Sequence, residues 1–241
     1  MNRFIPIASL FALFTALTVH AGDIKTGFVK KVLKSDDGES KYVVFVPKDY
    51  DGTKEYPVIL FLHGSGEVGT DGDKQAKGGL GKAIRDKGQI FPFITVFPQA
   101  DKKSWGPTSA SGKRALAILD QVEKDYKTDK KRVYLTGLSL GGSGTWSLAA
   151  AYPDRWAAIA PISGGGSTKT AKKIKDIPCW CFHGAADATV NPDKSREMIK
   201  ALKDAGGNPK YTEYPGVDHN CWDRAYATPG LYTWLLKQST K

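Results

Sequence analysis

Residues 133–146 read VYLTGLSLGGSGTW and contain the sharpest structural signal in the chain. The first four residues are an apolar, strand-like run, and a helical pattern rich in Ala and Leu follows the glycines. Between the two lies Gly137-Leu138-Ser139-Leu140-Gly141, a turn in which glycines let a strand and a helix approach closely. A serine on such a turn adopts strained dihedrals and exposes its hydroxyl, so Ser139 is the candidate nucleophile.

The remaining sequence alternates short β-rich runs with longer helical patterns. This alternation predicts an α/β fold, with a mostly parallel central sheet and helices on both faces. The predicted strands are Tyr42 to Val46, Val58 to Leu62, Phe93 to Phe97, Val133 to Thr136, Ala157 to Ala160, Cys179 to Phe182 and Tyr211 to Tyr214. The predicted helices lie near Lys77 to Lys87, Gly112 to Asp125, Gly142 to Ala151, Ser195 to Ala205 and Pro229 to Lys237. Ligands of such sheets bind beyond the carboxyl ends of the strands, so we expect the chemistry there.

The first 21 residues have the layout of a cleavable signal peptide, since Arg3 precedes a largely apolar run that ends in small residues around Ala21. A membrane anchor is the alternative. The run contains Pro6 and Ser9, however, and is shorter than the roughly 20 apolar residues of a spanning helix. We therefore expect a secreted or periplasmic protein whose mature part, residues 22–241, is 220 residues long (241 minus 21). That length suits a single catalytic domain without a large lid.

The charge balance is basic. The chain has 35 Lys and Arg against 25 Asp and Glu, and removal of Arg3 leaves 34 minus 25, or +9. The lysines are scattered in pairs among acidic residues and form no block with interleaved aromatic residues, so we expect no nucleic-acid partner. We interpret the charge as a solvated basic surface, and we expect no membrane partner after signal cleavage.

A serine nucleophile needs a general base and an acid that orients it. Where a serine stands on such a turn, the acid and then the histidine follow it along the chain. His63 precedes Ser139, and His183 ends a predicted strand, where a structural hydrogen bond is the commoner role. His219 lies in a loop after the last predicted strand, from which it can reach the serine. We predict that His219 is the base.

The acid is predicted in the loop that follows the strand Cys179 to Phe182, where Asp187 stands. Three other aspartates are less suitable. Asp176 precedes the strand, Asp193 begins a predicted helix, and Asp218 adjoins His219 too closely to align with it easily. Order and loop placement therefore favour Asp187.

Negative charge develops on the substrate oxygen during such a reaction and needs preorganised backbone donors. One predicted donor is the N–H of Leu140, directly after the nucleophile. The other should come from the loop after Val58 to Leu62, which reads His63-Gly64-Ser65-Gly66. We choose Ser65 as the second oxyanion donor, with Gly64 as the neighbouring alternative.

Five stretches, FLHGSGEVGTDG, GLSLGGSGTW, PISGGG, CFHGAADATV and YPGVDHNCWDRAY, carry a family resemblance. In order and spacing they resemble the bacterial secreted α/β-hydrolase esterases grouped as predicted peptidases or phospholipase/carboxylesterase-like hydrolases, which are related to feruloyl and acetyl xylan esterases. The resemblance covers essentially the mature chain. It implies an α/β-hydrolase fold with Ser139, Asp187 and His219 as the triad. The chain departs from the pattern at Val68, where relatives commonly carry a basic residue.

Four other residues near these motifs have two possible roles each. Trp105 and Trp222 could line an acyl or aryl pocket, or could pack in the interior. Glu67 and Asp71 could hold the predicted oxyanion loop in shape by hydrogen bonds, or could be solvated loop acids. The sequence leaves these alternatives open.

The chain has three cysteines, an odd number that leaves at least one thiol free or paired between chains. Cys179 and Cys181 are two apart in a predicted strand and share a face, so they are not expected to bridge each other. A triad would bring the Cys181 and Cys221 segments together, which makes a disulfide between those two a hypothesis. No metal-ligand spacing is present, so we expect no metal.

These residues predict a serine carboxylic ester hydrolase that acts through an acyl-enzyme without cofactor or metal. Little chain is left for a lid, which favours an accessible cleft and a bulky or polymeric ester, such as feruloyl or acetyl groups on plant polysaccharide. One alternative is a serine oligopeptidase of the same fold, although such enzymes usually carry an additional domain. The other is a non-catalytic carbohydrate-binding relative, which would be expected to have lost a triad residue. The sequence leaves the acyl group, the alcohol and the oligomeric state open.

Overall fold

The predicted alternation of strands and helices is present in the computed structural model, which describes residues 24–35, 38–88 and 90–240. The strands are β1 (Gly27–Ser35), β2 (Gly38–Val46), β3 (Tyr56–Leu62), β4 (Ile94–Pro98), β5 (Thr128–Leu138), β6 (Ala158–Ile162), β7 (Trp180–Gly184) and β8 (Lys210–Tyr214). The helices are α1 (Gly79–Asp86), α2 (Ala110–Asp125), α3 (Leu140–Ala151), α4 (Ala171–Ile174), α5 (Asp193–Asp204), α6 (Trp222–Ala227) and α7 (Leu231–Leu236). The predicted signal peptide lies outside the described residues.

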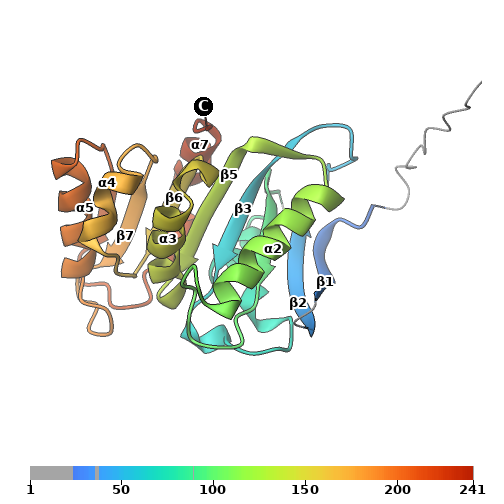
Figure 1. Ribbon diagram of the computed structural model, residues 1–241, viewed down its shortest axis with the longest axis horizontal. Coiled ribbons are helices and arrows are strands. Elements are labelled where there is room, and N and C mark those ends of the chain that lie inside the picture. Colours follow the sequence, from blue (N-terminus) through green and yellow to red (C-terminus); the bar gives the residue numbers. More distant parts are fainter. Residues whose placement is uncertain (1–23, 36–37, 89, 241) are drawn as a thin grey trace, which may run out of the picture.

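The eight strands form one sheet in the order β1-β2-β4-β3-β5-β6-β7-β8 (Figure 1). The pairs β1–β2 and β2–β4 are antiparallel, and the pairs from β4 through β3 to β8 are parallel. The chain passes from β3 outward to β4 and then returns to add β5 on the other side of β3. The strand order therefore reverses between β3 and β5, and a crevice opens beyond the carboxyl ends of strands at such a point.

Helices cover both faces of the sheet, and side chains of each strand alternate between two cores. Val58, Leu60 and Leu62 of β3 point into the core beneath α2, α3, α4 and α5, which Figure 1 shows in front of the sheet. Ile59 and Phe61 point to the opposite core, beneath α1, α6 and α7. Both cores consist of buried apolar side chains, so the central strands are covered on two sides, as parallel strands require.

All seven predicted strands and all five predicted helices are found, with shifted ends. Strand β5 begins at Thr128, five residues before the predicted start, because Thr128 pairs with Tyr56 although the residues between are polar. Strand β1 was not predicted. Its sequence, GFVKKVLKS, is that of a half-exposed edge strand, so it lacks the apolar run of the central strands. None of the helices in the described part of the chain is long and apolar enough to span a membrane.

Candidate active site

Ser139 lies where β5 ends and α3 begins, at the point where the strand order reverses. Its backbone has φ 53° and ψ −115°, a strained conformation for a residue with a side chain. Its N–H donates to the carbonyl of Ile162 on β6 at 2.9 Å. A Cβ at Gly141 would overlap the carbonyl oxygen of Leu62, so only glycine lets α3 approach β3 here. The turn predicted from the sequence therefore has the expected geometry.

A chain of hydrogen bonds connects Ser139 with the two other predicted residues. The Nε2 atom of His219 lies 2.9 Å from the Ser139 hydroxyl, and its Nδ1 atom lies 2.7 Å from Oδ2 of Asp187. A carboxylate can only accept, so Nδ1 carries the hydrogen and Nε2 is free to accept from the serine. The His219 side chain is 18% exposed, whereas that of Asp187 is fully buried. Solvent and substrate can thus reach the serine and histidine but not the aspartate.

The carboxylate of Asp187 is held by backbone donors as well as by His219. Its Oδ1 atom accepts from the N–H groups of Thr189 and Val190, both at 2.9 Å. Burial alone would raise the pKa of Asp187, but the hydrogen bonds from His219 and from the two backbone groups outweigh it and lower the pKa below its ordinary value. Asp187 is therefore ionised and can stabilise a positively charged His219.

The loop that carries His219 is fixed by contacts that the sequence did not indicate. Ser163, at the end of β6, is fully buried, has φ 46°, and donates its hydroxyl to the His219 carbonyl at 3.0 Å. The N–H of Ala186 donates to the carbonyl of Val217 at 2.9 Å. A Cβ at Gly184 would overlap the carbonyl of Val217, so the two loops pack backbone to backbone. These contacts set the separation of Asp187 and His219.

Leu140 and Ser65, the predicted oxyanion donors, each begin a helical segment. Leu140 is the first residue of α3, and Ser65 is the first residue of the short 3₁₀ helix η2 (Ser65–Glu67). The first N–H groups of a helix have no intrahelical acceptor, so both are available to a substrate oxygen. A Cβ placed on Gly64 would lie 3.6 Å from the Cβ of Ser139. The loop after β3 therefore runs directly beside the nucleophile, as expected.

The segment His63–Gly72, called here the oxyanion loop, is anchored by Gln99 at the end of β4. The Gln99 amide nitrogen donates to the carbonyl of Glu67 at 2.9 Å and to Oδ2 of Asp71 at 3.1 Å, and its oxygen accepts from the N–H of Gly72 at 2.6 Å. No sequence motif indicates this role of Gln99. A single buried amide thus connects three positions of the loop.

Asp71 also holds the loop, which resolves one of the open alternatives. Its Oδ1 atom accepts from the N–H groups of Lys74 and Asp73 at 2.9 and 2.8 Å. The hydrogen bond from Lys74 has the largest effect on the Asp71 carboxyl, and with those from Gln99 and Asp73 it lowers the pKa to about 2. Asp71 therefore stays charged and keeps its loop contacts over the whole neutral range.

His63 supports the loop from the inside and is neutral. Its Nδ1 donates to the carbonyl of Gly64 at 2.6 Å, and its Nε2 accepts from the N–H of Ala100 at 2.9 Å. Burial lowers the pKa of His63 to about 4, although the hydrogen bond to Gly64 acts in the opposite direction. Its approach to Glu67, 4.0 Å, is therefore not an ion pair at neutral pH.

The two predicted pocket tryptophans differ in position. Trp105 is 2% exposed, packs edge-on against His63, and donates its ring N–H to the His63 carbonyl at 3.0 Å. Its proposed role as a pocket residue is therefore wrong: it packs in the interior and holds the oxyanion loop. Trp222 is partly exposed and meets the His219 ring edge-to-face, with 5.3 Å between ring centroids. That position is compatible with contact to a substrate.

The hypothesised disulfide between Cys181 and Cys221 is not found, and all three cysteines are buried free thiols. Cys181 points into the core beneath α5, whereas Cys221 points into the opposite core. The Cys181 thiol donates to the Ser195 hydroxyl at 3.4 Å, and the Cys221 sulfur lies 3.1 Å from the Ser163 hydroxyl. Burial raises the pKa of Cys221 to about 11 and that of Cys181 to about 12, so both are unreactive thiols at neutral pH.

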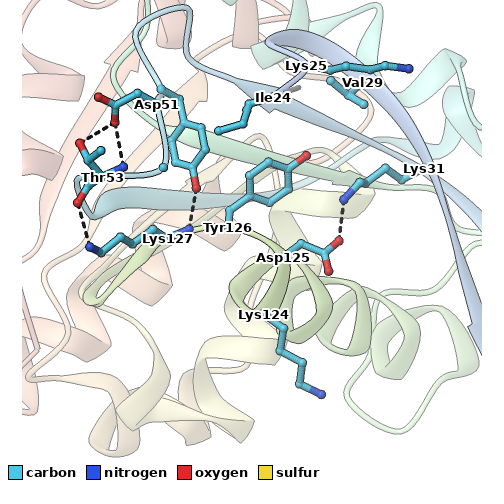
Figure 2. Close-up of a pocket in the computed structure, with 12 residues that line it drawn as sticks. Ile24, Lys25, Val29, Lys31, Asp51, Thr53, Lys124, Asp125, Tyr126 and Lys127 are labelled. Atoms are coloured by element: carbon cyan, nitrogen blue, oxygen red, sulfur yellow. Dashed lines mark hydrogen bonds and ion pairs between the residues drawn. The ribbon is translucent and has the colours of Figure 1, made fainter. Parts of the chain in front are cut away.

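A cavity of about 680 Å³ lies away from these residues (Figure 2). It is lined by the loop around Tyr50 and by residues 124–127 at the end of α2, near the amino ends of β3 and β5. Lys31 and Asp125 pair across it (Figure 2). The Tyr50 hydroxyl accepts from the N–H of Lys127. Ser139 is at the carboxyl end of β5, so this cavity is not part of the site.

In the residues that the structure describes, no group of three or more His, Cys, Asp or Glu could hold a metal ion.

The strand–serine–helix turn at the reversal point of a mostly parallel eight-stranded sheet is the architecture of an α/β-hydrolase. Comparison with solved structures agrees. The crystal structure of a thermostable esterase superposes with a TM-score of 0.80 at 33% sequence identity, covering 88% of this chain and 63% of that one. The fold class expected from the sequence is confirmed.

Sequence comparison narrows this class to a family. Residues 35–222 match the family model described as "Putative esterase". The chain belongs to this esterase family, which confirms the enzyme class predicted from the sequence, a carboxylesterase, as well as the family resemblance.

Two curated relatives show how the match is distributed. The chain is 28% identical over 185 residues to the bifunctional acetylxylan esterase/xylanase XynS20E of Neocallimastix patriciarum, covering 74% of this chain but only 26% of that protein. It is 27% identical over 233 residues to the "Probable feruloyl esterase C" of Aspergillus niger, covering 93% of this chain and 84% of that protein. The chain thus spans about a quarter of the bifunctional relative and most of the feruloyl esterase.

Proposed function

We propose that the protein is an exported serine carboxylic ester hydrolase in which Ser139 is the nucleophile, His219 the general base and acid, and Asp187 the residue that orients His219. The observation that carries the proposal is the hydrogen-bond chain from Ser139 through His219 to the buried Asp187. The strained turn at Ser139 supports the same assignment because it presents the hydroxyl at the end of the strand.

In the first half of the reaction, Oγ of Ser139 attacks the ester carbonyl carbon while Nε2 of His219 takes the hydroxyl proton. The carbonyl oxygen becomes an oxyanion that accepts hydrogen bonds from the N–H groups of Leu140 and Ser65. As the carbonyl re-forms, the bond to the alcohol oxygen breaks and His219 gives its proton to that oxygen. The products are a free alcohol and an acyl group on Ser139.

In the second half, water replaces the alcohol. His219 takes a proton from the water as its oxygen bonds to the acyl carbon, and the oxyanion forms again in the same place. The bond from the acyl carbon to Oγ then breaks, and His219 returns the proton to Ser139. The carboxylic acid leaves, and no metal or cofactor takes part in either half.

We further propose that the substrate is a feruloyl or acetyl ester on plant polysaccharide. The names of the two curated relatives support this class, because one is an acetylxylan esterase/xylanase and the other a feruloyl esterase. Trp222 supports an aromatic acyl group, since its partly exposed ring beside His219 offers a flat apolar surface. A partly exposed serine and histidine are compatible with a polymeric substrate.

Export is the remaining part of the proposal and rests on the signal-peptide layout of residues 1–21. We expect the protein recovered from outside the producing cytoplasm to begin at Gly22. Intact-mass measurement of that protein tests this, and a mass that retains residues 1–21 would contradict cleavage.

The decisive experiment assays the mature protein and Ser139→Ala with p-nitrophenyl acetate, methyl ferulate, acetylated xylan and a peptide anilide. We expect hydrolysis of the esters and a fall of about 10⁴- to 10⁶-fold in kcat for Ser139→Ala. Mass spectrometry of quenched reactions should show an acyl adduct on Ser139 in the parent. Parent-level turnover by Ser139→Ala would overturn the mechanism. Cleavage of the anilide alone would identify an oligopeptidase, and binding of xylan without turnover a non-catalytic relative.

A further inference from the structure

His183 lies directly behind Asp187 and takes no part in the reaction steps described above. It stands near the end of β7, and its side chain is fully buried. Its Nε2 atom is 3.1 Å from Oδ2 of Asp187 and 2.9 Å from the carbonyl oxygen of Val190. Its Nδ1 atom is 2.7 Å from the hydroxyl of Ser195, which is itself fully buried in the first turn of α5. Both ring nitrogens therefore have partners.

The partners of the ring determine which nitrogen carries a hydrogen. The Val190 carbonyl and the Asp187 carboxylate can only accept, so Nε2 of His183 is a donor to both. In the neutral ring, Nδ1 then accepts from the Ser195 hydroxyl. The same Oδ2 atom of Asp187 also accepts from Nδ1 of His219. Two imidazole N–H groups therefore converge on one carboxylate oxygen, one on the reacting side and one behind it.

This arrangement completes the donor set of Asp187. Oδ1 accepts two backbone N–H groups, and Oδ2 accepts the two imidazole N–H groups. A carboxylate with two donors on each oxygen cannot rotate without breaking several hydrogen bonds at once. Beside this cluster, Glu213 of β8 faces His183 across the strand pair and is held by Arg196 of α5 at 2.6 and 2.9 Å. The charge of Glu213 is thus already paired.

We propose that His183 is a positioning residue for the esterase reaction. It fixes the Asp187 oxygen that orients His219, and its N–H dipole offsets part of the negative charge on that oxygen. The negative charge that Nδ1 of His219 meets on Oδ2 is therefore smaller than it would be on a carboxylate without the His183 hydrogen bond. This inference rests on the roles proposed above for Ser139, His219 and Asp187.

The first test replaces His183 by leucine, which fills the space but donates nothing. For His183→Leu we expect kcat with methyl ferulate to fall roughly ten- to hundredfold, the range for losing one hydrogen bond to a charged group. KM should stay within about twofold, because the substrate does not touch His183. In a plot of kcat/KM against pH, the fall in activity on the acid side, called here the acid limb, should move to higher pH. The reason is that Asp187, with one hydrogen-bond donor fewer, would attract the proton on His219 more strongly.

Rescue by a second variant separates hydrogen bonding from packing. In His183→Gln the side-chain amide can place N–H donors near the position of Nε2, so most of the lost kcat and the parental acid limb should return. If His183→Gln is as impaired as His183→Leu, or if folded His183→Leu keeps the parental kcat and pH profile, the positioning role is wrong. Circular dichroism of each variant establishes that it is folded.

Ser195→Ala keeps the proposal testable if His183→Leu does not fold, because it removes only the hydroxyl that fixes the ring. We expect a smaller shift of the acid limb in the same direction. The matched control is Ser111→Ala. Ser111 is a buried serine on α2 whose hydroxyl donates to Asp101 at 2.8 Å, and its loss should leave the pH profile unchanged. An unshifted acid limb in Ser195→Ala would overturn the inference. Parent-level activity of Ser139→Ala in the same assays would instead overturn the proposed function.

Discussion

Two loops flank Ser139, and they are stabilised in different ways. The oxyanion loop is tied down by Gln99, Asp71 and a neutral His63, and the pKa values of Asp71 and His63, about 2 and about 4, keep these groups unchanged near neutral pH. The acid loop, residues 184–190, instead holds a buried carboxylate between two imidazole rings. The backbone donors of the oxyanion loop thus lie on a different loop from the Asp187 carboxylate that supports proton transfer by His219.

This difference has a physical reason. An oxyanion hole works by having its donors in place before charge develops, so it gains from fixed hydrogen bonds that do not titrate. Proton transfer needs a base whose charge changes during the cycle, so Asp187 must stay ionised beside it. We therefore expect substitutions in the oxyanion loop to alter rate or stability without moving the pH profile of activity. Substitutions in the acid loop should alter the rate and also move the pH profile.

The largest effect is expected on the acid side, from Asp187→Asn. An amide of the same size cannot accept as a carboxylate does and favours the wrong tautomer of His219, so kcat should fall by about 10⁴-fold. Initial rates with p-nitrophenyl acetate measure the effect. The oxyanion donors remain, so some turnover above the uncatalysed rate should persist. A loss of less than tenfold would show that Asp187 does not orient the base.

On the oxyanion side, His63 should make stability depend on pH. The unfolded chain protonates His63 below its ordinary pKa of 6.5, whereas the folded protein resists until about pH 4. Between pH 6.5 and pH 4 the unfolded state therefore binds a proton that the folded state does not bind. The free energy of unfolding has its full value above pH 6.5 and falls by about 3 kcal/mol as the pH decreases to 4. Urea unfolding of the parent and of His63→Gln across this window measures it. Equal pH slopes for the two proteins would contradict the prediction.

Gln99→Leu should loosen the oxyanion loop without touching the acid loop. The three hydrogen bonds between Gln99 and the loop would be lost, two donated by its amide nitrogen and one accepted by its oxygen. Misplacement of the Ser65 N–H should then reduce kcat by about tenfold. The pH profile of kcat/KM should keep its parental midpoint. A shifted midpoint would show that the two loops are not electrostatically separate.

The smallest effect is expected from Ser163→Ala, which removes the hydroxyl that holds the His219 carbonyl. The N–H of Cys221 still donates to that carbonyl, so kcat/KM should fall only about three- to tenfold, as for one neutral hydrogen bond. Ser147→Ala is the control, because Ser147 is an exposed serine on α3 bonded to its own helix. An equal loss in both variants would show that the Ser163 hydroxyl does not position His219.

The sequence by itself determined the elements whose geometry is local. The turn around Ser139 could be recognised because its glycines and the adjoining strand and helix are neighbours in the chain. The rule that the acid and then the histidine follow the serine selected Asp187 and His219, and the structure brings both into one hydrogen-bond chain with Ser139. Edge strand β1 was missed because its lysine-rich pattern carries no local signal of burial.

Only the tertiary structure decided which side chains meet. Ser139 and His219 are 80 positions apart, and their hydrogen bond depends on how β5 and β8 lie in one sheet. The sequence was compatible with Trp105 lining a pocket, but the folded chain buries it. The sequence was also compatible with a disulfide between Cys181 and Cys221, but these residues lie in opposite cores. His183 looked like a structural residue, yet it shares an oxygen of Asp187 with the base. Hydrogen-bond partners between distant segments follow from packing, and packing is a property of the whole fold.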